Sequence, residues 1–283
     1  MALLTIAGLT LREASRRKLL IALVAITLIV IPLVGWGFSR IPTIHCRQGC
    51  SPADFRVAEA GILILVAYMF AFVIAVAAPF MAAPAIASDI ESHLLLGILP
   101  RPIRRSELVV GKWMGLVALV GGYAIFACGL QFVAVRIAVG YVPPHPILTT
   151  LFIVAEAVAL LTLGILGSTR LSPITCGIVA VALFGVTWII GIAGQIGAAD
   201  GISVLANVGT ASSLILPTDG LWRAAVFNLE PVSILAVSSG SREAAANPFV
   251  VLAAPTAAYV AWALLWIGGI LALAVKSFST REV

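Results

Sequence analysis

The chain has 283 residues, of which 61% are hydrophobic and 10% are charged, and its formal net charge is +5. Its mean hydropathy is +1.15. About a quarter of the residues in a soluble globular protein are charged, so this chain has too little polar surface to cover a soluble particle. The composition argues against a soluble enzyme or binding domain and predicts a protein surrounded largely by lipid.

Six apolar runs are each long enough to cross a membrane as an α-helix, which takes about 18 residues or more. The pattern is not that of the short alternating strands of a β-barrel. We therefore expect an all-α polytopic membrane protein, with one transmembrane domain over residues 1–283. The expected spans are residues 19–38, 58–81, 113–139, 147–167, 174–196 and 249–275.

The residues before the first span have helical spacing, with Leu4, Ala7 and Leu11 on one side and Arg12 and Arg16 on the other. A basic amphipathic helix of this kind lies in the headgroup plane of a membrane. The alternative is that these residues are the first turns of the first membrane helix. The first apolar run is longer than a signal-peptide core and no A-x-A site follows it, so we expect an anchor that is not cleaved.

The loop after the first span, SRIPTIHCRQGCSPADFR, contains His45, Cys46 and Cys50. Two thiols and one imidazole are too few for a closed zinc site. We favour a disulfide between Cys46 and Cys50, which needs an oxidising compartment, and two free thiols are the alternative. Cys128 and Cys176 lie within apolar spans and are expected to be packing residues.

Residues 84–112 form a charged segment between the second and third spans. Ser88 and Glu91 match the S-x-x-E capping box that begins a helix, and Asp89 adds a second acid. Pro100 and Pro102 end that short helix because neither has an N–H to donate.

The same segment contains three consecutive leucines, Leu94, Leu95 and Leu96, followed by Arg101. Exposed leucines beside charges are typical of a surface that docks a partner. We expect a short helix that presents these leucines to a soluble partner. The alternative is a plain solvated loop.

The entry to the third span has its own pattern. Ser106 is expected to cap the helix, and Glu107 in the first turn favours its dipole. We expect Arg104, Arg105 and Lys112 to extend towards anionic lipid headgroups.

Glu156 lies inside the fourth span, in LFIVAEAVALLTLG. A carboxylate in hydrocarbon is costly and marks a functional residue by default. Two roles fit this position, a structural hydrogen bond and direct contact with a substrate. Arg136, near the end of the third span, is either its partner or a cation at the membrane interface.

Residues 197–247 are too interrupted to span a membrane and too apolar for a free loop. They contain Pro217, Asp219 and Gly220. We expect one or two short re-entrant helices in the outer leaflet, packed on protein so that their backbone groups are satisfied. Trp222 and Arg223 are expected at the interface.

Basic residues predict the orientation, because cytoplasmic loops carry the excess of lysine and arginine. With a cytoplasmic N-terminus, eleven of the 17 basic residues are inside, mainly in residues 12–18 and 101–112. Both termini are then cytoplasmic, and Cys46 and Cys50 face the oxidising side. We expect a multi-pass protein of the cytoplasmic (inner) membrane.

Motifs of catalysis and metal binding are missing from the sequence. His45, His93 and His145 fall in three different loops on two sides of the membrane, so they cannot form one metal site. The sequence has no H-E-x-x-H or G-x-S-x-G motif. It also has no phosphate loop, since VVGKW lacks the first glycine, the spacing and the hydroxyl of that motif. We predict no catalytic, cofactor or metal residues.

Several stretches of the chain resemble the ABC-2 type permeases, the membrane subunits of ATP-binding-cassette exporters. LTLREASRRKLLIALVAITLIVIPLVGWGF is similar to the amphipathic elbow and first helix of that family. DIES with LPRPIRRSELVVGKW resembles the acidic turn and the loop that enters helix three. ILGSTRLSPITCGIVA, LILPTDGLWRAA and FSTREV resemble later features in the same order. At His93-Leu94 the chain departs from many relatives, which have Gly-Thr.

The resemblance implies that the loop between helices two and three is a coupling helix that rests on a separate ABC ATPase subunit. That subunit would bind ATP and Mg²⁺, so no cofactor belongs to this chain. A second permease copy, identical or different, and membrane lipid are the other implied partners, and nucleic acid is not one. The residues that match the coupling loop are Asp89, Glu91, Leu94, Leu95, Leu96, Arg101, Arg104 and Arg105.

Three functions remain open from the sequence. The first is export of a hydrophobic or amphipathic substrate. The second is transmission of ATP-driven motion to an extracytoplasmic protein without moving a solute. The third, a secondary transporter, would need several buried ionisable groups for a coupling ion, and Glu156 is a single one.

Overall fold

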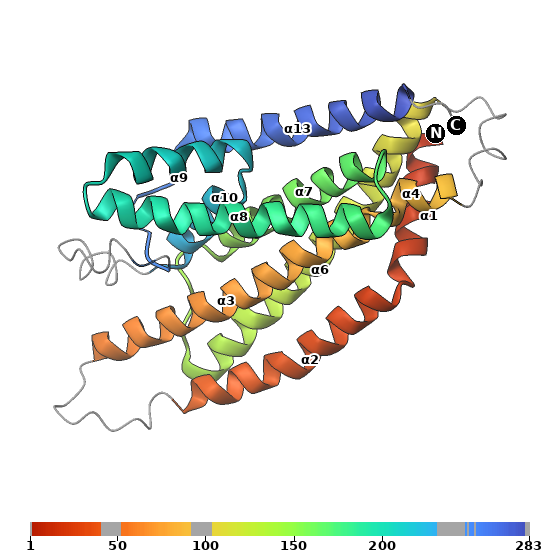
Figure 1. Ribbon diagram of the computed structural model, residues 1–283. Coiled ribbons are helices and arrows are strands. Elements are labelled where there is room, and N and C mark those ends of the chain that lie inside the picture. Colours follow the sequence, from red (N-terminus) through yellow and green to blue (C-terminus); the bar gives the residue numbers. More distant parts are fainter. Residues whose placement is uncertain are drawn as a thin grey trace.

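The computed structural model describes residues 2–40, 52–91, 104–230, 247, 249–251 and 253–280. Within these ranges the chain is helical and contains no strand (Figure 1). The helices are α1 (Ala2–Ser15), α2 (Lys18–Ser39), α3 (Pro52–Ala82), α4 (Pro84–Glu91), α6 (Arg105–Val139), α7 (Pro146–Ser168), α8 (Pro173–Ala199), α9 (Ser203–Ile215), α10 (Thr218–Leu229) and α13 (Ala257–Ser279).

Six of the helical segments are long and apolar enough to cross a membrane: α2, residues 57–88 of α3 and α4, α6, α7, α8 and α13. This confirms the all-α polytopic membrane fold. Helix α7 is central, since it packs against α3, α4, α6, α8, α10 and α13. Helices α2 and α13 expose large apolar side chains such as Ile29 and Leu265, as helices facing lipid do.

Two helices begin away from the apolar runs that predicted them. Helix α6 begins at Arg105, eight residues before the apolar run 113–139 and two residues before the start expected from a Ser106 cap. Contacts within the protein satisfy its first charged residues. Helix α13 begins at Ala257 because Thr256 caps it, its hydroxyl oxygen accepting from the N–H of Tyr259 at 3.2 Å. The hydropathy of the sequence contains no information on either contact, so the apolar runs could not predict these two helix starts.

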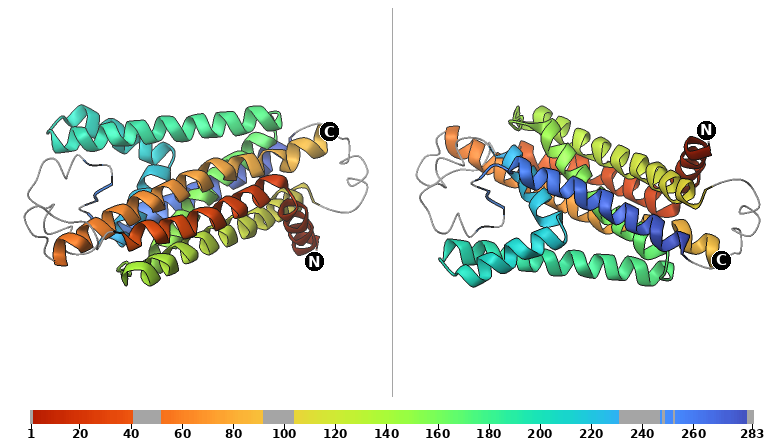
Figure 2. Two further views of the ribbon diagram at one scale, coloured as in Figure 1. Left: turned by 90° about the horizontal axis from the view of Figure 1, so that it is seen from below. Right: turned by 90° about the horizontal axis from the view of Figure 1, so that it is seen from above.

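Helix α1 is separate from α2 and is not its first turn, which excludes that alternative. The backbone is extended at Arg17, between the two helices. Figure 2 shows α1 at a steep angle to the other helices, and it packs across α6. Its residues Leu4 and Leu9 are exposed while Ala14 is buried.

The segment after α8 forms the expected short helices. The chain turns at Gly201, whose φ of 73° lies in the left-handed region that favours glycine, and α9 runs back along α8. Helix α10 lies between this pair and the rest of the bundle (Figure 2). Trp222 of α10 is only 4% exposed, so the prediction that it lies at the interface is wrong.

Candidate functional site

One end of the bundle holds the start of α1, the end of α13, α4 and the start of α6 (Figure 1). The predicted partner-docking residues Leu94, Leu95, Leu96 and Arg101, together with His93, lie outside the described residues. Asp89 and Glu91 are at the end of α4, where only the backbone is described. The predicted disulfide of Cys46 and Cys50, with His45, also lies outside the described residues.

Arg105, the first residue of α6, holds the end of α13. Its guanidinium donates to the carbonyl oxygens of Phe278 at 3.4 Å and Ser279 at 3.3 Å, and it lies over the Phe278 ring. A cation at the carboxyl end of a helix is favourable because the last carbonyls are unpaired and the helix dipole is negative there. Arg105 therefore contacts protein through its guanidinium, and its approach to lipid headgroups stays a prediction.

Arg170, in the turn between α7 and α8, contacts the same end of α13. Its guanidinium donates to the carbonyl oxygen of Ser277 at 3.1 Å and to the hydroxyl of Thr280 at 3.0 Å. The end of α13 is therefore bound to two other parts of the bundle, α6 through Arg105 and the α7–α8 turn through Arg170.

Lys112 connects α6 to α4. Its ammonium donates to the carbonyl oxygen of Ala85, and the residue is 8% exposed. The prediction that Lys112 reaches the headgroups is therefore wrong. The helix before residues 92–103 and the helix after them are joined by this bond.

The caps predicted around residues 84–112 differ from those observed. Ser88 lies inside α4, and its hydroxyl donates to the carbonyl oxygen of Pro84, so it does not begin a helix. The N-cap of α6 is Arg104, not Ser106. The Arg104 N–H donates to the Glu107 carboxylate at 3.2 Å, which satisfies one of the free N–H groups at this helix start.

Two glycines of α6 make room for α1. A Cβ at Gly115 would lie 2.5 Å from the carbonyl oxygen of Ala7, and one at Gly111 would lie 2.9 Å from the side chain of Ile6. The spacing of these glycines is G-x-x-x-G, which is typical of close helix packing in membranes. The G-x-x-x-G spacing is present in the sequence, but we had not used it to predict the contact between α1 and α6.

A second cluster of polar residues is buried near the middle of the bundle. Glu156 is 4% exposed, and its Oε2 has no hydrogen-bond partner among the described residues. Arg136 is exposed and forms no ion pair with it, so Arg136 is not its partner. The carboxyl group that interacts electrostatically with Glu156 belongs to Asp219 of α10.

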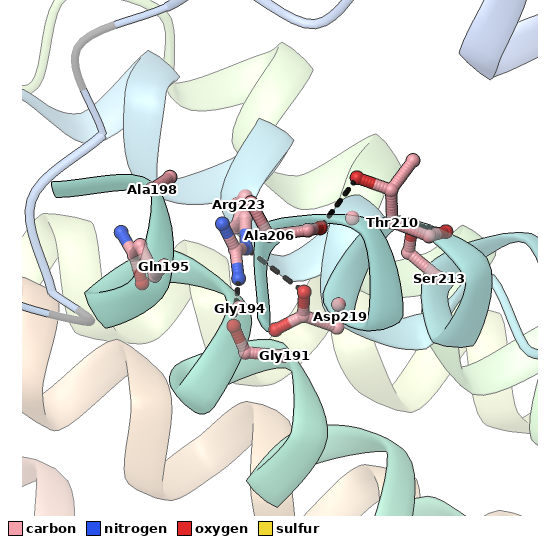
Figure 3. A pocket seen from close by; sticks show the side chains of 11 residues that line it. Gly191, Gly194, Gln195, Ala198, Ala206, Thr210, Ser213, Asp219 and Arg223 are labelled. Carbon is pink, nitrogen blue, oxygen red and sulfur yellow. Dashed lines mark hydrogen bonds and ion pairs between the residues drawn. The ribbon is translucent and has the colours of Figure 1, made fainter. Parts of the chain in front are cut away.

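Asp219 is bound to Arg223, one turn further along α10. The guanidinium Nε lies 2.9 Å from the Asp219 Oδ2, and an Nη donates to the carbonyl oxygen of Gly191 on α8 at 2.7 Å (Figure 3). Burial raises the pKa of Asp219, and the ion pair with Arg223 opposes this rise. Gly191 packs directly on this pair: a Cβ there would lie 2.5 Å from the carboxyl carbon of Asp219, so the carboxyl group would have to shift to admit one.

A cavity of about 210 Å³ opens beside this ion pair, between α8, α9 and α10 (Figure 3). Figure 3 shows Asp219 and Arg223 against Gly191 of α8, with Gln195 further along the same helix. The residues that line it include Gly191, Gly194, Gln195, Thr210, Asp219 and Arg223.

Aromatic rings surround Tyr68 of α3, which interacts electrostatically with Glu156. Its ring centroid is 5.7 Å from that of Trp188 in a stacked arrangement. It lies 5.2 Å from Trp222 and 5.3 Å from Phe249, both edge to face. Glu156 was predicted as a site residue, whereas Tyr68 and Asp219 were not, because the packing of α10 against α3 and α7 brings them together.

The end of α10 contains a further buried carboxyl group, Glu230. Its Oε1 accepts from the N–H of Val251 at 2.9 Å, and its Oε2 is buried without a partner among the described residues. Burial raises the pKa of Glu230 to about 7, against the effect of the Val251 hydrogen bond.

Cys128 and Cys176 are buried and free, as packing residues are. In the described part of the chain, no three histidine, cysteine, aspartate or glutamate side chains are grouped as metal ligands.

Comparison with known proteins gives one result for nearly the whole chain. A family model described as "ABC-2 family transporter protein" matches residues 4–283. No curated protein matches the chain.

Proposed function

Because the chain belongs to the ABC-2 family of transporter proteins and is a multi-pass membrane permease, we propose that it exports a hydrophobic or amphipathic substrate. The energy comes from ATP that a separate ATPase subunit binds with Mg²⁺ and hydrolyses. Two permease copies, identical or different, form the pathway across the cytoplasmic membrane.

The observation that carries this proposal is the set of bonds at the start of α6. Lys112 binds α4, and Arg105 binds the end of α13. Residues 92–103 run between α4 and α6, so a force on them acts on both helices. The bond of Arg105 passes that force to α13.

The end of the bundle that holds α4 and the start of α6 has features of a cytoplasmic end. Helices α1 and α4, the start of α6 and the end of α13 lie together there (Figure 1). The basic residues of 12–18 with Arg104, Arg105 and Lys276 belong to these segments. Cytoplasmic ends of membrane helices carry such an excess of positive charge. A cytoplasmic position of this end supports our proposal that an ATPase docks here, since ATP is found on that side.

The test is a variant with Leu94, Leu95 and Leu96 all replaced by Asp, co-expressed with a candidate ABC ATPase subunit that the wild-type chain retains in a pull-down. Burial of about two leucines at a contact contributes roughly 3–5 kcal/mol, so we expect the variant to insert but to lose the ATPase in a pull-down. Unchanged pull-down and unchanged ATPase activity would show that these leucines do not dock it.

Vesicles distinguish export from transmission of motion to another protein. We expect ATP-dependent substrate movement in vesicles that contain only this chain and its ATPase. Movement that appears only when an extracytoplasmic protein is added would favour the energy transmitter.

A further inference from the structure

The cavity between α8, α9 and α10 has groups of both charges on its wall (Figure 3). Arg223 and Asp219 of α10 line it, and they are paired through the guanidinium Nε and the Asp219 Oδ2 at 2.9 Å. Gln195 of α8 with Thr210 and Ser213 of α9 supply its other polar side chains. The wall therefore has no net charge, but it holds one cation and one anion side by side.

Arg223 has hydrogen-bonding capacity that the described chain does not use. A guanidinium has five N–H groups. Arg223 directs one to Asp219 and one to the carbonyl oxygen of Gly191 at 2.7 Å, so five less two leaves three without an acceptor in the described residues. The side chain is 28% exposed. The unused N–H groups of a guanidinium that is held on two sides suit the oxygen atoms of a phosphate group.

The same cavity offers acceptors to a cationic group. Arg223 holds Asp219 through Oδ2, so Oδ1 has no donor among the described residues. The hydroxyl groups of Thr210 and Ser213 donate to backbone carbonyl oxygens at 3.0 and 2.8 Å. The amide nitrogen of Gln195 donates to two others at 3.4 and 3.2 Å. The oxygen atoms of these side chains can therefore accept from an ammonium group, which has N–H donors and no acceptor.

The size of the cavity limits what can enter it. Its volume of about 210 Å³ is roughly that of seven water molecules in the liquid, which is room for a small polar group and not for a whole lipid. Ala198 and Thr210 line the cavity and are exposed, so it is reached from the surface. Gly194 and Gly209 bound it where α8 and α9 meet, since a Cβ on Gly194 would lie 2.6 Å from the Gly209 Cα.

The cavity lies at the depth of lipid headgroups. Its α8 residues are at most eight positions from the helix end at Ala199, which is about 12 Å along the axis. Helix α8 has 27 residues and is about 40 Å long, whereas the hydrocarbon core is about 30 Å thick. The end of α8 therefore extends to the headgroups. Val204, Val208 and Ile215 are exposed on the face of α9 that points away from the cavity, as residues in contact with acyl chains are.

We propose that this cavity binds the headgroup of a zwitterionic phospholipid, a phosphate group joined to a primary ammonium as in phosphatidylethanolamine. The phosphate oxygens accept from Arg223, the ammonium donates to Asp219, and the acyl chains stay in the membrane outside the cavity. The two charges of such a headgroup match the two charges of the wall, whereas a purely anionic headgroup would set a second negative charge beside Asp219. This inference does not depend on the proposed export, and it holds for either orientation of the chain.

Equilibrium binding to the purified full chain in an uncharged detergent tests the site. The probe is radiolabelled dihexanoyl phosphatidylethanolamine, and protein-free micelles give the background. Dihexanoyl phosphatidylglycerol is one control, with the same phosphodiester and tails but no ammonium, and dihexanoylglycerol is another, with neither charge. We expect the ethanolamine lipid to bind at least about tenfold more tightly than either control, because hydrogen bonds to charged groups contribute that much.

Free phosphoethanolamine distinguishes a lipid from a soluble ligand with the same chemistry. We expect it to displace the labelled lipid only at concentrations at least about tenfold higher than unlabelled lipid, because it lacks the apolar tails. Displacement at equal concentrations would overturn the lipid as the ligand and would assign the cavity to a soluble zwitterion.

Three variants assign the binding to this cavity. Ala206→Leu fills part of it and leaves both charges in place, whereas Ala211→Leu adds the same side chain on the exposed face of α9. We expect the first to lose the preference for the ethanolamine lipid and the second to keep it. Asp219→Asn combined with Arg223→Gln removes both charges together, so that neither is left unpaired, and it should bind the three lipids alike. The thermal unfolding midpoint shows that each variant is folded.

Equal binding of the ethanolamine and glycerol phospholipids to the wild-type chain would overturn the inference. A preference that survives in the folded double variant, or in folded Ala206→Leu, would overturn it as well, because the lipid would then bind elsewhere. The assay needs neither ATP nor the ATPase. A failure of the exporter proposal, seen as a chain that does not retain its ATPase, is therefore a separate result.

Discussion

The guanidinium of Arg105 and the carbonyl oxygen of Phe278 are 3.4 Å apart although the two residues are 173 positions apart in the chain. Arg105 begins α6, directly after the segment proposed to contact the ATPase, and Phe278 is in the last turn of α13. The contact holds the end of α13, the last membrane helix, against the first turn of α6, the third membrane helix.

Replacement of Arg105 by Ala should uncouple these two helices without unfolding the chain. Arg170 still holds the end of α13, and a half-exposed contact of this kind contributes about 1 kcal/mol. We expect several-fold less substrate moved per ATP hydrolysed, measured in vesicles. Arg136→Ala is the control, since that side chain is exposed at the other end of α6. An unchanged ratio in Arg105→Ala would contradict the role.

Gly115→Ala should displace α1 from α6. The added Cβ would lie 2.5 Å from the carbonyl oxygen of Ala7, whereas a Cβ at Gly122 of the same helix meets nothing within 4 Å. We expect Gly115→Ala to speed trypsin cleavage after Arg12, Arg16 and Arg17 in detergent. Gly122→Ala should not, and it is favoured by about 1 kcal/mol of helix propensity. Equal cleavage rates would show that α1 does not depend on this close contact.

Gly191→Ala should disturb the Asp219–Arg223 pair without a change of charge. The new methyl group would occupy space within 2.5 Å of the Asp219 carboxyl carbon, while Gly185 of the same helix has no neighbour within 4 Å. Loss of a partly buried ion pair costs on the order of 1–3 kcal/mol. We expect a lower thermal unfolding midpoint for Gly191→Ala and no such loss for Gly185→Ala. A midpoint equal to wild type would mean that α8 tolerates the methyl group.

Glu230 should make stability depend on pH. Its pKa rises from 4.5 to about 7 in the folded chain, so the folded state binds the proton more tightly than the unfolded state. The resulting stabilisation is fully present below pH 4.5 and is lost as the pH rises through 7. We expect the unfolding midpoint of wild type to fall by several degrees over that range relative to Glu230→Gln. Parallel pH profiles for the two proteins would contradict this.

The sequence predicted the membrane helices well where lipid contact decides the structure. Helices α2 and α7 begin and end within one residue of the apolar runs 19–38 and 147–167, because hydrocarbon thickness sets their length. The start of α6 was predicted from its capping residues to within two positions, because Glu107 accepts from the Arg104 N–H. The bond of Lys112 to Ala85 is a tertiary contact, which no local pattern contains.

The buried cluster was predicted only in part for the same reason. A carboxylate inside an apolar run marks Glu156 without any structure. Asp219 follows Pro217 in a segment that proline and glycine interrupt, a pattern typical of the membrane interface. Its burial depends on the packing of α10 between α7 and α8. Trp222 was wrongly predicted at the membrane interface for a similar reason, because an aromatic residue beside an arginine is typical of a membrane surface.

The central claim is that residues 92–103 face the cytoplasm and receive the ATPase. Thiol labelling with a membrane-impermeant maleimide tests it, using Leu96→Cys in a chain with Cys46 and Cys50 replaced by Ser, since Cys128 and Cys176 are buried. The account predicts no labelling in intact cells, labelling in inverted vesicles, and protection there by the bound ATPase. Labelling of position 96 from outside intact cells would contradict it.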